Sequence, residues 1–373
     1  MKIVLAPDKF KSSLTGLEFC DAVEHGIKTI IPEATIVKCP LADGGDGTIE
    51  ILSYHLDGEI VSLPVSDPLF RPIVGTYLYI KSKRVAFIEM AEASGMKLLD
   101  PAERNCFNTT SFGTGELILD AIKKGATTIV LGIGGSATND CGIGMATALG
   151  YGFEDEGGKK LTPIGKHLNK IKNINTSSVI PELNNVAFKV ASDVTNPLYG
   201  PNGAAHVYGP QKGASTKEIE ILDQGLRHFS KIIVNDYQLN VQNLEGAGAA
   251  GGMGAGAKVF LNAQLNSGIN LVKEMINFES HVHDADWIIT GEGKLDEQTL
   301  SGKTIHGVLT SARKFDVQVA ALCGAVSLPN TNYGMHYIDS VIERAKNLDD
   351  AMANSKSYVN EMAKDFAVKR LKT

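Results

Sequence analysis

The sequence predicts an α/β protein made of two domains, and three observations support this prediction. The chain opens with two alternations of a short apolar strand pattern and a helical pattern, an order that favours a parallel sheet with right-handed crossovers. The C-terminal part of the chain alternates in the same way. A length of 373 residues leaves room for two hydrophobic cores, because one domain usually holds about 100–200 residues.

The first β-α-β-α segment has a signal for each element. Ile3–Leu5 is a short apolar run typical of a strand that is covered on both faces. Thr15 and Glu18 have the spacing of a capping box, and apolar residues then recur at helical intervals. Ala34–Lys38 predicts a second strand, and Thr48–Leu56 a second helix after a glycine-rich loop.

The remaining elements follow from the same patterns. Strands are expected at Val85–Glu89, Thr128–Gly132, Val186–Ala191, Trp287–Thr290, Val317–Cys323 and Tyr337–Ile342, and helices at Gly115–Lys124, Gly142–Leu149, Leu265–Phe278 and Lys303–Phe315. The simplest arrangement joins both ends of the chain in one sheet and inserts the second domain between them. We therefore predict a discontinuous terminal domain of residues 1–66 and 284–373 and an inserted domain of residues 67–283.

Composition and charge exclude several classes of protein. Apolar residues make up 43% of the chain and charged residues 21%, as in a soluble globular protein. A net charge of −6 gives no support to nucleic-acid binding, so an anionic ligand would need locally placed cations and backbone N–H groups. The five cysteines are scattered and indicate reduced thiols. Neither a signal peptide nor a membrane-spanning run is expected, and we predict a cytoplasmic protein.

A polar loop follows the first strand without a spacer. Asp8, Lys9 and Lys11 lie at the carboxyl end of this strand, where open α/β sheets bind their ligands. Two cations and one acid at this place predict an anionic substrate together with a metal ion. An ordinary charged loop is the alternative.

A second candidate site is the loop after the strand Thr128–Gly132. Its glycines let backbone N–H groups converge, and the start of the next helix adds a partial positive charge, so the loop favours a phosphate or a carboxylate. A plain tight turn is the alternative. The residues expected to bind the anion or to cap the helix are Gly134, Gly135, Ser136, Thr138, Asn139 and Asp140.

The same loop supports a rival interpretation. Gly132, Gly134 and Ala137 fit the dinucleotide fingerprint G-x-G-x-x-G/A, and acidic residues follow about 20 residues later. Gly142 and Gly144 fit it badly, because they weaken the helix that should support the pyrophosphate. A dinucleotide-dependent oxidoreductase that acts on a small hydroxy acid is therefore the alternative function, and a non-catalytic sensor of a sugar acid or a nucleotide is a third.

Two further segments contain glycines that suit ligand contacts. Gly246–Gly256 predicts either a loop that approaches a ligand closely, through Gly251 and Gly252, or a flexible hinge. Gly302 and Lys303 resemble the end of a Walker A loop, but the first glycine of that motif is missing. No P-loop is expected, although Lys303 can reach phosphates from the start of its helix.

Acidic residues recur in the loops after predicted strands. They are Asp43, Asp46, Asp193, Glu292 and Asp296. Proteins usually hold Mg²⁺ with one or two carboxylates plus substrate phosphates, so we expect Asp43, Asp46 and Asp193 to supply the metal ligands. The nine histidines lack the spacing of a metal site, and no G-x-S-x-G nucleophile motif is present.

Nine sequence blocks resemble, in order and at compatible spacing, those of the bacterial type-1 glycerate kinase family. They are APDKFKSSLT (Ala6–Thr15), LADGGDGT (Leu41–Thr48), IEMAEASG (Ile88–Gly95), TSFGTGELI (Thr110–Ile118), GIGGSATND (Gly132–Asp140), SDVTNPLYG (Ser192–Gly200), GPQKGA (Gly209–Ala214), the Gly246–Gly256 run and TGEGKLDEQTLSGKT (Thr290–Thr304). The chain departs from the family pattern at Ile305-His306 and at Cys106, where proline is expected; neither position carries obvious chemistry.

The resemblance implies an activity and a fold. The expected activity is transfer of the γ-phosphoryl group of ATP to a hydroxyl of D-glycerate with Mg²⁺, with 2-phosphoglycerate as the favoured product. The expected fold is a Rossmann-like parallel-sheet domain from both termini plus a different, inserted mixed α/β domain, with the active site in the cleft between them. We expect a monomer or a homodimer without nucleic-acid or membrane partners.

Phosphoryl transfer mainly needs positioning and charge neutralisation, which suggests roles for the candidates. Asp8, Lys9 and Lys11 would face the transferring group, with the lysines offsetting its charge and that of the glycerate carboxylate. Asp193 or Asp296 would orient or deprotonate the attacking hydroxyl. The further phosphate and substrate contacts are expected from Gly251, Gly252, Glu292 and Lys303. Which acid is the base, which acids hold Mg²⁺ and which loop takes the nucleotide stay open.

Overall fold

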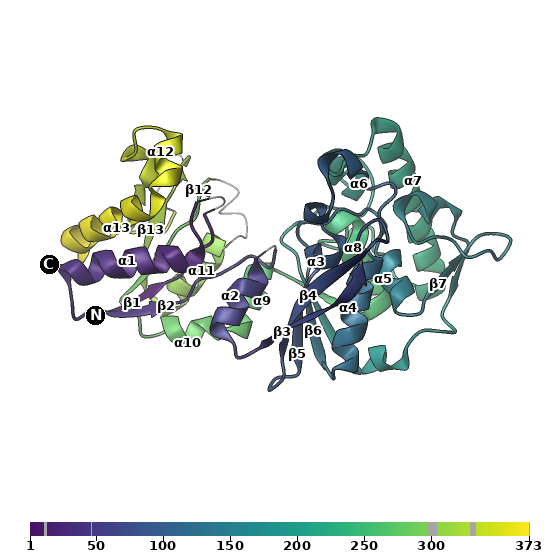
Figure 1. The fold of residues 1–373 in the computed structure, drawn as a ribbon, viewed down its shortest axis with the longest axis horizontal. Coiled ribbons are helices and arrows are strands. Elements are labelled where there is room, and N and C mark those ends of the chain that lie inside the picture. The colour runs from purple at the N-terminus through teal and green to yellow at the C-terminus, as the bar shows by residue number, and fades with distance from the viewer. Residues whose placement is uncertain (11–12, 46, 297–303, 329–332, 373) are drawn as a thin grey trace. The chain divides into compact units, whose positions relative to one another are not determined.

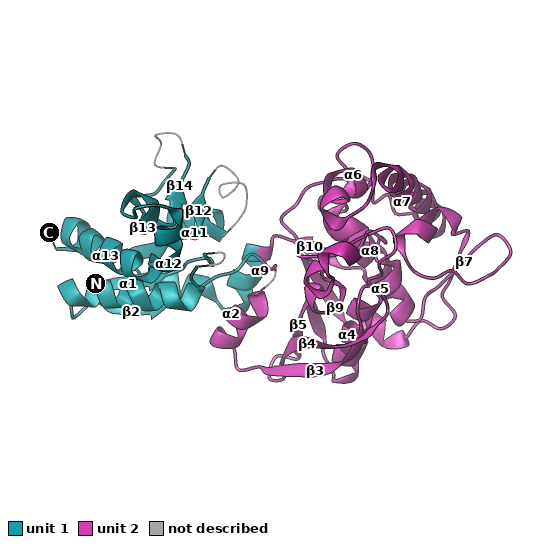
Figure 2. Cartoon of the chain, turned by 45° about the horizontal axis from the view of Figure 1, so that its top comes forward, with its two compact units in different colours: residues 1–43, 269–373 teal, residues 44–268 magenta. Residues whose placement is uncertain are grey.

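The computed structural model describes residues 1–10, 13–45, 47–296, 304–328 and 333–372. It divides into two compact units (Figure 1, Figure 2). Unit 1 combines Met1–Asp43 with Ile269–Thr373, and unit 2 is the intervening Gly44–Gly268. Both ends of the chain therefore lie in unit 1.

The limits of the units differ from the predicted ranges of 1–66 with 284–373 and of 67–283. Residues 44–66 belong to unit 2 because their strand pairs with the next strand of that unit. Residues 269–283 belong to unit 1, where Lys273 donates a hydrogen bond to the carbonyl of Gly307 and the Ser311 hydroxyl donates one to Glu279.

Unit 1 is built on a five-stranded, all-parallel sheet. Its strands are β1 (Lys2–Leu5), β2 (Thr35–Lys38), β11 (Trp287–Thr290), β13 (Gln318–Cys323) and β15 (Tyr337–Ser340), in the order β15-β13-β11-β1-β2. Because side chains alternate along a strand, the sheet has two buried faces. Ile3, Leu5 and Ile289 pack with α1 (Gly16–Ile30) and α13 (Ser355–Phe366) on one face. The α11 helix (Thr304–Phe315) packs with β11 and β13.

The predicted start of α1 is confirmed. Thr15 and Glu18 form a capping box, in which the Thr15 hydroxyl accepts the N–H of Glu18 and the Glu18 carboxylate accepts the N–H of Thr15. This exchange satisfies backbone donors that the first turn of a helix leaves unpaired. The helix then buries Phe19, Val23 and Ile27 in the core of unit 1.

The strand order of unit 1 alone predicts where a ligand-binding crevice lies. The chain leaves β1 toward β2 on one side of the sheet, whereas β11 leads to β13 on the other side. At such a switch point the loops diverge, and open parallel sheets bind ligands at the carboxyl ends of the two strands concerned. The loops that follow Leu5 and Thr290 flank this position.

Unit 2 contains a six-stranded mixed sheet. Its strands are β3 (Glu59–Ser66), β4 (Pro72–Ile80), β5 (Val85–Glu89), β6 (Thr128–Gly132), β9 (Ala187–Ala191) and β10 (Gln264–Asn266), in the order β10-β9-β6-β5-β4-β3. The four strands from β5 to β10 are parallel, and β3 and β4 are antiparallel to their neighbours. The α4 helix (Phe112–Lys123) buries Leu117 and Ile118 against this sheet.

The other helices and strands complete the two units. They are α2 (Thr48–His55), α3 (Ala91–Ser94), α5 (Ile143–Ala148), β7 (Gly152–Glu154), β8 (Asn173–Asn175), α6 (Ala204–Tyr208), α7 (Thr216–Tyr237), α8 (Ala249–Leu261), α9 (Gly268–Met275), α10 (Phe278–Val282), β12 (Lys294–Leu295), β14 (Ala325–Val326) and α12 (Leu348–Ala353). A second core in unit 2 centres on Phe153, Phe229 and Phe260, whose rings lie 5.7–6.3 Å apart.

Two predicted elements are wrong in part. The segment Leu265–Phe278, expected to be one helix, begins as the edge strand β10, and α9 starts only at Gly268. Asn277 has a φ of 54°, which ends α9 and separates it from α10. The strand predicted to reach Ile342 ends at Ser340, and the chain continues as a 3-10 turn, Val341–Glu343.

Candidate active site

The loop after β1 is held by backbone hydrogen bonds to the segment after β11. The N–H of Ala6 donates to the carbonyl of Ile289 at 2.8 Å, and the N–H of Asp8 donates to that of Gly291 at 2.8 Å. The Thr290 hydroxyl donates to the carbonyl of Ala6. Pairing therefore continues past the end of the strands, and the Asp8 carboxylate is placed by the sheet itself.

Asp8 lies at the switch point, and both oxygens of its carboxyl group accept hydrogen bonds. Its Oδ1 accepts the N–H of Lys9 at 2.7 Å, and its Oδ2 accepts the Thr304 hydroxyl at 2.6 Å. Burial raises the pKa of Asp8 above its usual value and the nearby Asp43 raises it further, against the lowering effect of these hydrogen bonds. A cation beside the two carboxylates would remove this repulsion.

The segment after β11 supplies further charged side chains. Gly291 comes directly after the strand, and a Cβ there would lie 2.1 Å from the carbonyl oxygen of Leu322, so only glycine fits. The short strand β12 then pairs in parallel with β14. Lys294 lies on β12 and forms an ion pair with Asp296, with an Nζ–Oδ2 distance of 3.6 Å.

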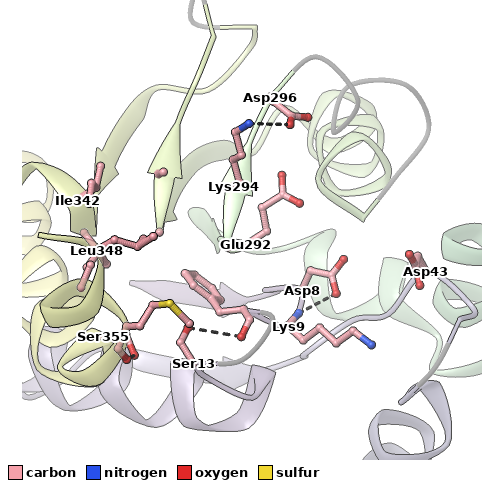
Figure 3. Close-up of a pocket in the computed structure, with 17 residues that line it drawn as sticks. Asp8, Lys9, Ser13, Asp43, Glu292, Lys294, Asp296, Ile342, Leu348 and Ser355 are labelled. Carbon is pink, nitrogen blue, oxygen red and sulfur yellow. Dashed lines mark hydrogen bonds and ion pairs between the residues drawn. The ribbon is translucent and has the colours of Figure 1, made fainter. Parts of the chain in front are cut away.

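These loops line one cavity of about 410 Å³ that lies within unit 1 (Figure 3). Its charged end holds Asp8, Lys9, Asp43, Glu292, Lys294 and Asp296. Its other end is apolar and is formed by Val341, Ile342, Leu348, Ala351 and Met352. The cavity therefore suits a ligand that has a charged part and an apolar part.

The charged end fits a magnesium ion that is carried by a phosphate ligand. All its acidic donors are carboxylate oxygens, which Mg²⁺ prefers. In the described part of the chain, no group of three or more His, Cys, Asp or Glu side chains is placed to hold a metal ion. Proteins usually hold Mg²⁺ with one or two carboxylates plus phosphate oxygens, and Asp8 and Asp43 are two carboxylates of this cavity.

Unit 2 presents the glycine loop after β6. Gly134 and Gly135 are exposed, whereas the residues from Ser136 to Asp140 are buried. Two backbone hydrogen bonds join the loop to the segment after β5. The N–H of Ala137 donates to the carbonyl of Ser94, and the N–H of Met96 donates to the carbonyl of Gly135. The two exposed glycines leave their backbone open to a ligand.

A buried lysine lies beneath this loop. Lys212 is only 4% exposed, and its Nζ donates to the Ser136 hydroxyl at 2.7 Å and to the carbonyl of Thr138 at 2.8 Å. No carboxylate of the described residues forms an ion pair with Lys212, and burial lowers the pKa of its ammonium group to about 8. The loop thus lies on a buried ammonium group that donates hydrogen bonds to neutral acceptors, while the charge of Asp140 opposes part of the fall in its pKa.

Two polar side chains of the loop have unsatisfied atoms. The Asn139 amide nitrogen and oxygen and the Thr138 hydroxyl are buried, and none of the described residues forms a hydrogen bond with them. Leaving buried polar groups unpaired costs about 1–3 kcal/mol each. Lys212 and these atoms are the polar groups that lie within the loop.

Asp140 is buried within the protein and does not face the exposed part of the loop where an anion would bind. It is completely buried, and its carboxylate accepts the N–H groups of Ser111, Gly142 and Gly144 and the Ser111 hydroxyl. Burial raises the pKa of Asp140, while these donors oppose the rise. Its oxygens hold the start of α5, a role that the sequence offered as the helix cap.

The second glycine run is a packed segment. Ala250, Gly251 and Gly252 have φ values of 53°, 71° and 88°, and all three residues lie inside α8 as assigned. A Cβ on Gly251 would lie 2.1 Å from the carbonyl oxygen of Thr138, and the N–H of Cys141 donates to the carbonyl of Gly251. The run therefore packs against the residues that follow the loop after β6, at Thr138 and Cys141.

Two carboxylates of unit 2 accept hydrogen bonds from backbone N–H groups at the starts of helices. The Asp193 Oδ1 accepts the N–H of Gly268 at 2.9 Å, where α9 begins. Glu89, at the end of β5, accepts the N–H groups of Gly47 and Ile49 at the start of α2. Both carboxylates therefore stabilise helix starts at the carboxyl edge of the mixed sheet.

Comparison with known proteins decides the family. The model of the glycerate kinase family matches residues 3–370. The chain belongs to the glycerate kinase family. It is 43% identical to the glycerate kinase of Bacillus subtilis (strain 168), over 98% of this chain and 97% of that protein. It is 41% identical to the glycerate 2-kinase of Escherichia coli (strain K12), over 98% and 97% of the two chains.

A solved structure shares the fold of this glycerate kinase family member. It is a crystal structure from Salmonella typhimurium LT2, provisionally assigned as glycerate kinase 2, with a TM-score of 0.88 and 41% sequence identity. The match covers 99% of this chain and 97% of that one. The two different α/β units of the family member thus form a fold that has been solved before.

The oxidoreductase alternative finds no support in the family or in the structure. The dinucleotide fingerprint needs a helix that opens at the last small residue of the motif, but α5 begins at Ile143, well after Ala137. The acids expected to bind the ribose lie at or just after β7, which pairs with β8 in a separate two-stranded sheet. The loop of this family member therefore lacks the geometry of a dinucleotide site.

The structure divides the predicted site residues between the two units. Asp8, Lys9, Asp43, Glu292 and Asp296 line the cavity of unit 1. Unit 2 carries Gly134, Gly135, Ser136, Thr138, Asn139, Asp140, Asp193, Gly251 and Gly252. The predicted residues Lys11, Asp46 and Lys303 lie outside the described residues.

Sequence reasoning missed three contributors to these sites. Lys212 follows no strand, and its only signal is its place in the block GPQKGA. Lys294 lies in the block that already supplied Glu292 and Asp296. The apolar end of the cavity follows β15 in a segment without any motif. Among the described residues, no helix is long and apolar enough to cross a membrane.

Proposed function

We propose that this chain is an ATP-dependent glycerate kinase that transfers the γ-phosphoryl group of ATP to D-glycerate and releases ADP. The observation that carries the proposal is the family match over residues 3–370. The relative named glycerate 2-kinase favours 2-phosphoglycerate as the product. The cavity at the switch point of unit 1 supports the proposal, because it combines lysines and carboxylates as phosphoryl transfer requires.

In unit 1 we assign the charged side chains to the phosphates and their metal ion. Lys9 and Lys294 would offset phosphate charge, and Asp8 and Asp43 would hold Mg²⁺. The ion would neutralise the charge that develops on the transferring group. Asp296, paired with Lys294, is one candidate for the base that receives the proton of the attacking hydroxyl.

In unit 2 we assign the loop after β6 to an anionic group of a ligand. The N–H groups of Gly134 and Gly135 and the Ser136 hydroxyl would donate to oxygen atoms, with Lys212 supplying charge from beneath. The amide of Asn139 would gain the partner that it lacks. Asp193 is the second candidate for the base and a further candidate for the metal, because it lies in the loop that follows β9, and its Oδ1 accepts the N–H of Gly268.

The test is steady-state kinetics with D-glycerate and MgATP, with release of ADP as the readout and phosphorus NMR of the product. We expect a phosphoglycerate with the phosphate on the 2-hydroxyl. Lys9→Ala and Asp193→Asn should each lower kcat/KM by about a hundredfold or more. If the folded chain releases no ADP in the presence of D-glycerate, the proposed function is wrong. If both variants keep near-normal kcat/KM, the site assignment is wrong.

A further inference from the structure

The apolar end of the unit 1 cavity exposes large hydrophobic side chains. Ile342, Leu348 and Met352 are 36%, 65% and 40% exposed, and all three line the cavity. They follow β15 within one short segment, with Val341 and Ala351 buried beneath them. We refer to Ile342, Leu348 and Met352 as the apolar wall.

The apolar wall is held in place by polar contacts around it. The N–H of Ile342 donates to the carbonyl of Gly324 at 3.0 Å, which ties the wall to the loop after β13. Asn347 caps α12 by accepting the N–H of Asp350, and the Tyr358 hydroxyl donates to the Asp350 carboxylate at 2.8 Å. These contacts therefore hold the backbone that carries the apolar wall.

Only one substrate of the proposed kinase suits this surface. D-glycerate is a small polar acid, and it would gain nothing from contact with isoleucine, leucine and methionine. ATP carries at one end a flat aromatic base whose two faces suit apolar contact, and phosphates at the other. A cavity of about 410 Å³ is also in the size range of sites for large ligands, about 300–1,000 Å³.

We propose that unit 1 binds the nucleotide, with the adenine base against the apolar wall and the phosphates at the charged end of the cavity. This inference rests on the proposed function for the identity of the ligand. Figure 3 shows Ile342 and Leu348 on one side of the cavity and Asp8, Lys9 and Asp43 on the other. The base and the phosphates of one nucleotide therefore point toward opposite sides of a single cavity.

The charges of the cavity determine the form in which the nucleotide binds. Its described lining has four carboxylates, Asp8, Asp43, Glu292 and Asp296, against two lysines, Lys9 and Lys294. A bare triphosphate would meet repulsion from this excess of acids. The nucleotide binds as its magnesium complex, in which the divalent ion lies between phosphate oxygens and carboxylates.

The experiment compares two phosphate ligands on the full chain by titration calorimetry. MgADP contains the base, whereas magnesium pyrophosphate contains only the charged part. In the double variant Leu348→Gln, Met352→Gln we expect the Kd for MgADP to rise about tenfold, because apolar contact is lost. The Kd for magnesium pyrophosphate should stay within about twofold of the wild-type value, since the charged end is unchanged.

Val368→Gln is the matched control. Val368 is 52% exposed in unit 1 and does not line the cavity, so this variant should bind both ligands as the wild type does. Restoring an apolar side chain with Leu348→Met and native Met352 should return the Kd for MgADP to within about twofold of normal.

Several results would overturn the inference. They are an unchanged Kd for MgADP in the double variant, or an equal loss of affinity for MgADP and magnesium pyrophosphate. A third is a change of the sedimentation coefficient in the double variant with no change in MgADP binding, because the wall would then contact a second copy of the chain.

The inference and the proposed function can fail separately. If the chain releases ADP with D-glycerate but the wall variant keeps its KM for ATP, the nucleotide assignment is wrong and the kinase stands. If the chain phosphorylates no glycerate but MgADP binding depends on the wall, the cavity is a nucleotide site and the proposed activity is wrong.

Discussion

Asp8 shows how one residue can be costly for folding and useful for chemistry. Burial and the neighbouring Asp43 raise its pKa, which means that the folded state disfavours the ionised form. Its unfolded-state pKa is lower, so stability falls as the pH rises through the folded-state pKa. Above the unfolded-state pKa, Asp8 therefore lowers the free energy of unfolding relative to its value at acid pH.

We predict opposite effects of Asp8→Asn on stability and on activity. The variant removes the repulsion from Asp43 and keeps one hydrogen bond, because the asparagine oxygen can accept the Thr304 hydroxyl. It loses the bond from the N–H of Lys9, so we expect Tm to stay about the same or to rise. The kcat/KM for MgATP should fall by about a hundredfold or more, because the carboxylate that we propose as a metal ligand is lost. Differential scanning calorimetry and steady-state kinetics provide the two readouts. A lower Tm with retained kcat/KM would contradict this assignment.

Lys212 gives a prediction about pH. Its pKa is lowered from 10.5 to about 8, so between these pH values the unfolded chain binds more protons than the folded chain. The free energy of unfolding of the wild type should therefore rise, relative to that of Lys212→Met, as the pH increases from 8 to about 10.5. The full difference is on the order of 3 kcal/mol, and urea unfolding at several pH values measures it.

The activity of Lys212 variants separates a charge from a packing role. The kcat/KM of the wild type should decline above about pH 8 as the ammonium group beneath the loop deprotonates, whereas Lys212→Arg keeps its charge throughout this range. If the wild type and Lys212→Arg show the same decline, another group is titrating. A pH-independent stability difference between wild type and Lys212→Met would show that the lysine is not buried as a charge.

At the scale of elements, the two sites depend on backbone that approaches other backbone closely. The loop after β6 is supported by Gly251, whose φ of 71° and contact with the carbonyl of Thr138 leave no space for a side chain. Gly158 has a similar φ of 76°, but nothing lies within 4 Å of its would-be Cβ. A comparison of alanine substitutions at Gly158 and Gly251 therefore distinguishes the cost of a positive φ from the cost of a steric clash.

We predict that Gly158→Ala lowers the free energy of unfolding by about 1 kcal/mol, the cost of the left-handed conformation alone. Gly251→Ala should lower it by about 3 kcal/mol or more, because the loop at 138–139 must also move. The same variant should weaken the kinase activity, whereas Gly158→Ala should not. Equal losses of stability in chemical denaturation would show that the loop does not depend on the close contact with Gly251.

The strands and the first helices were predictable because their signals are local. The apolar run of β1, the capping box at Thr15 and the buried strand β6 all appear where the sequence predicts them. The long helix α7 begins with a capping box at Ser215 and Glu218 and buries apolar residues at helical intervals, a local signal that the sequence prediction missed. The strand β10 has only three residues, too few for a period to show.

The candidate site was predictable only as far as it follows strands. Asp8, Asp43 and Glu292 lie in loops after strands β1, β2 and β11, and a parallel sheet brings such loops to one edge. Lys212 reaches its loop from a distant 3-10 turn, and the apolar wall comes from a segment after β15. Tertiary packing determines the positions of Lys212 and of the apolar wall, and no local sequence pattern predicts these positions.

At the scale of the whole molecule, the division into units differs from the predicted one because packing, not chain order, sets it. The helix α2 follows the first β-α-β segment in sequence, but its start is held by Glu89 of β5. It therefore belongs to unit 2, although residues up to 43 belong to unit 1. Each unit has its own hydrophobic core, so a ligand of one unit should stabilise that unit directly.

The single tryptophan of the chain reports on unit 1 alone. Trp287 lies in β11, is 7% exposed, and its ring packs against that of Phe366 with a centroid distance of 4.9 Å. We predict that MgADP at a hundredfold excess over its Kd raises the free energy of unfolding that tryptophan fluorescence reports by about 2.7 kcal/mol. Far-UV circular dichroism, to which both units contribute, is measured on the same samples. If MgADP shifts the circular dichroism transition and leaves that of Trp287 in place, the nucleotide binds to unit 2 and its assignment to the cavity of unit 1 is wrong.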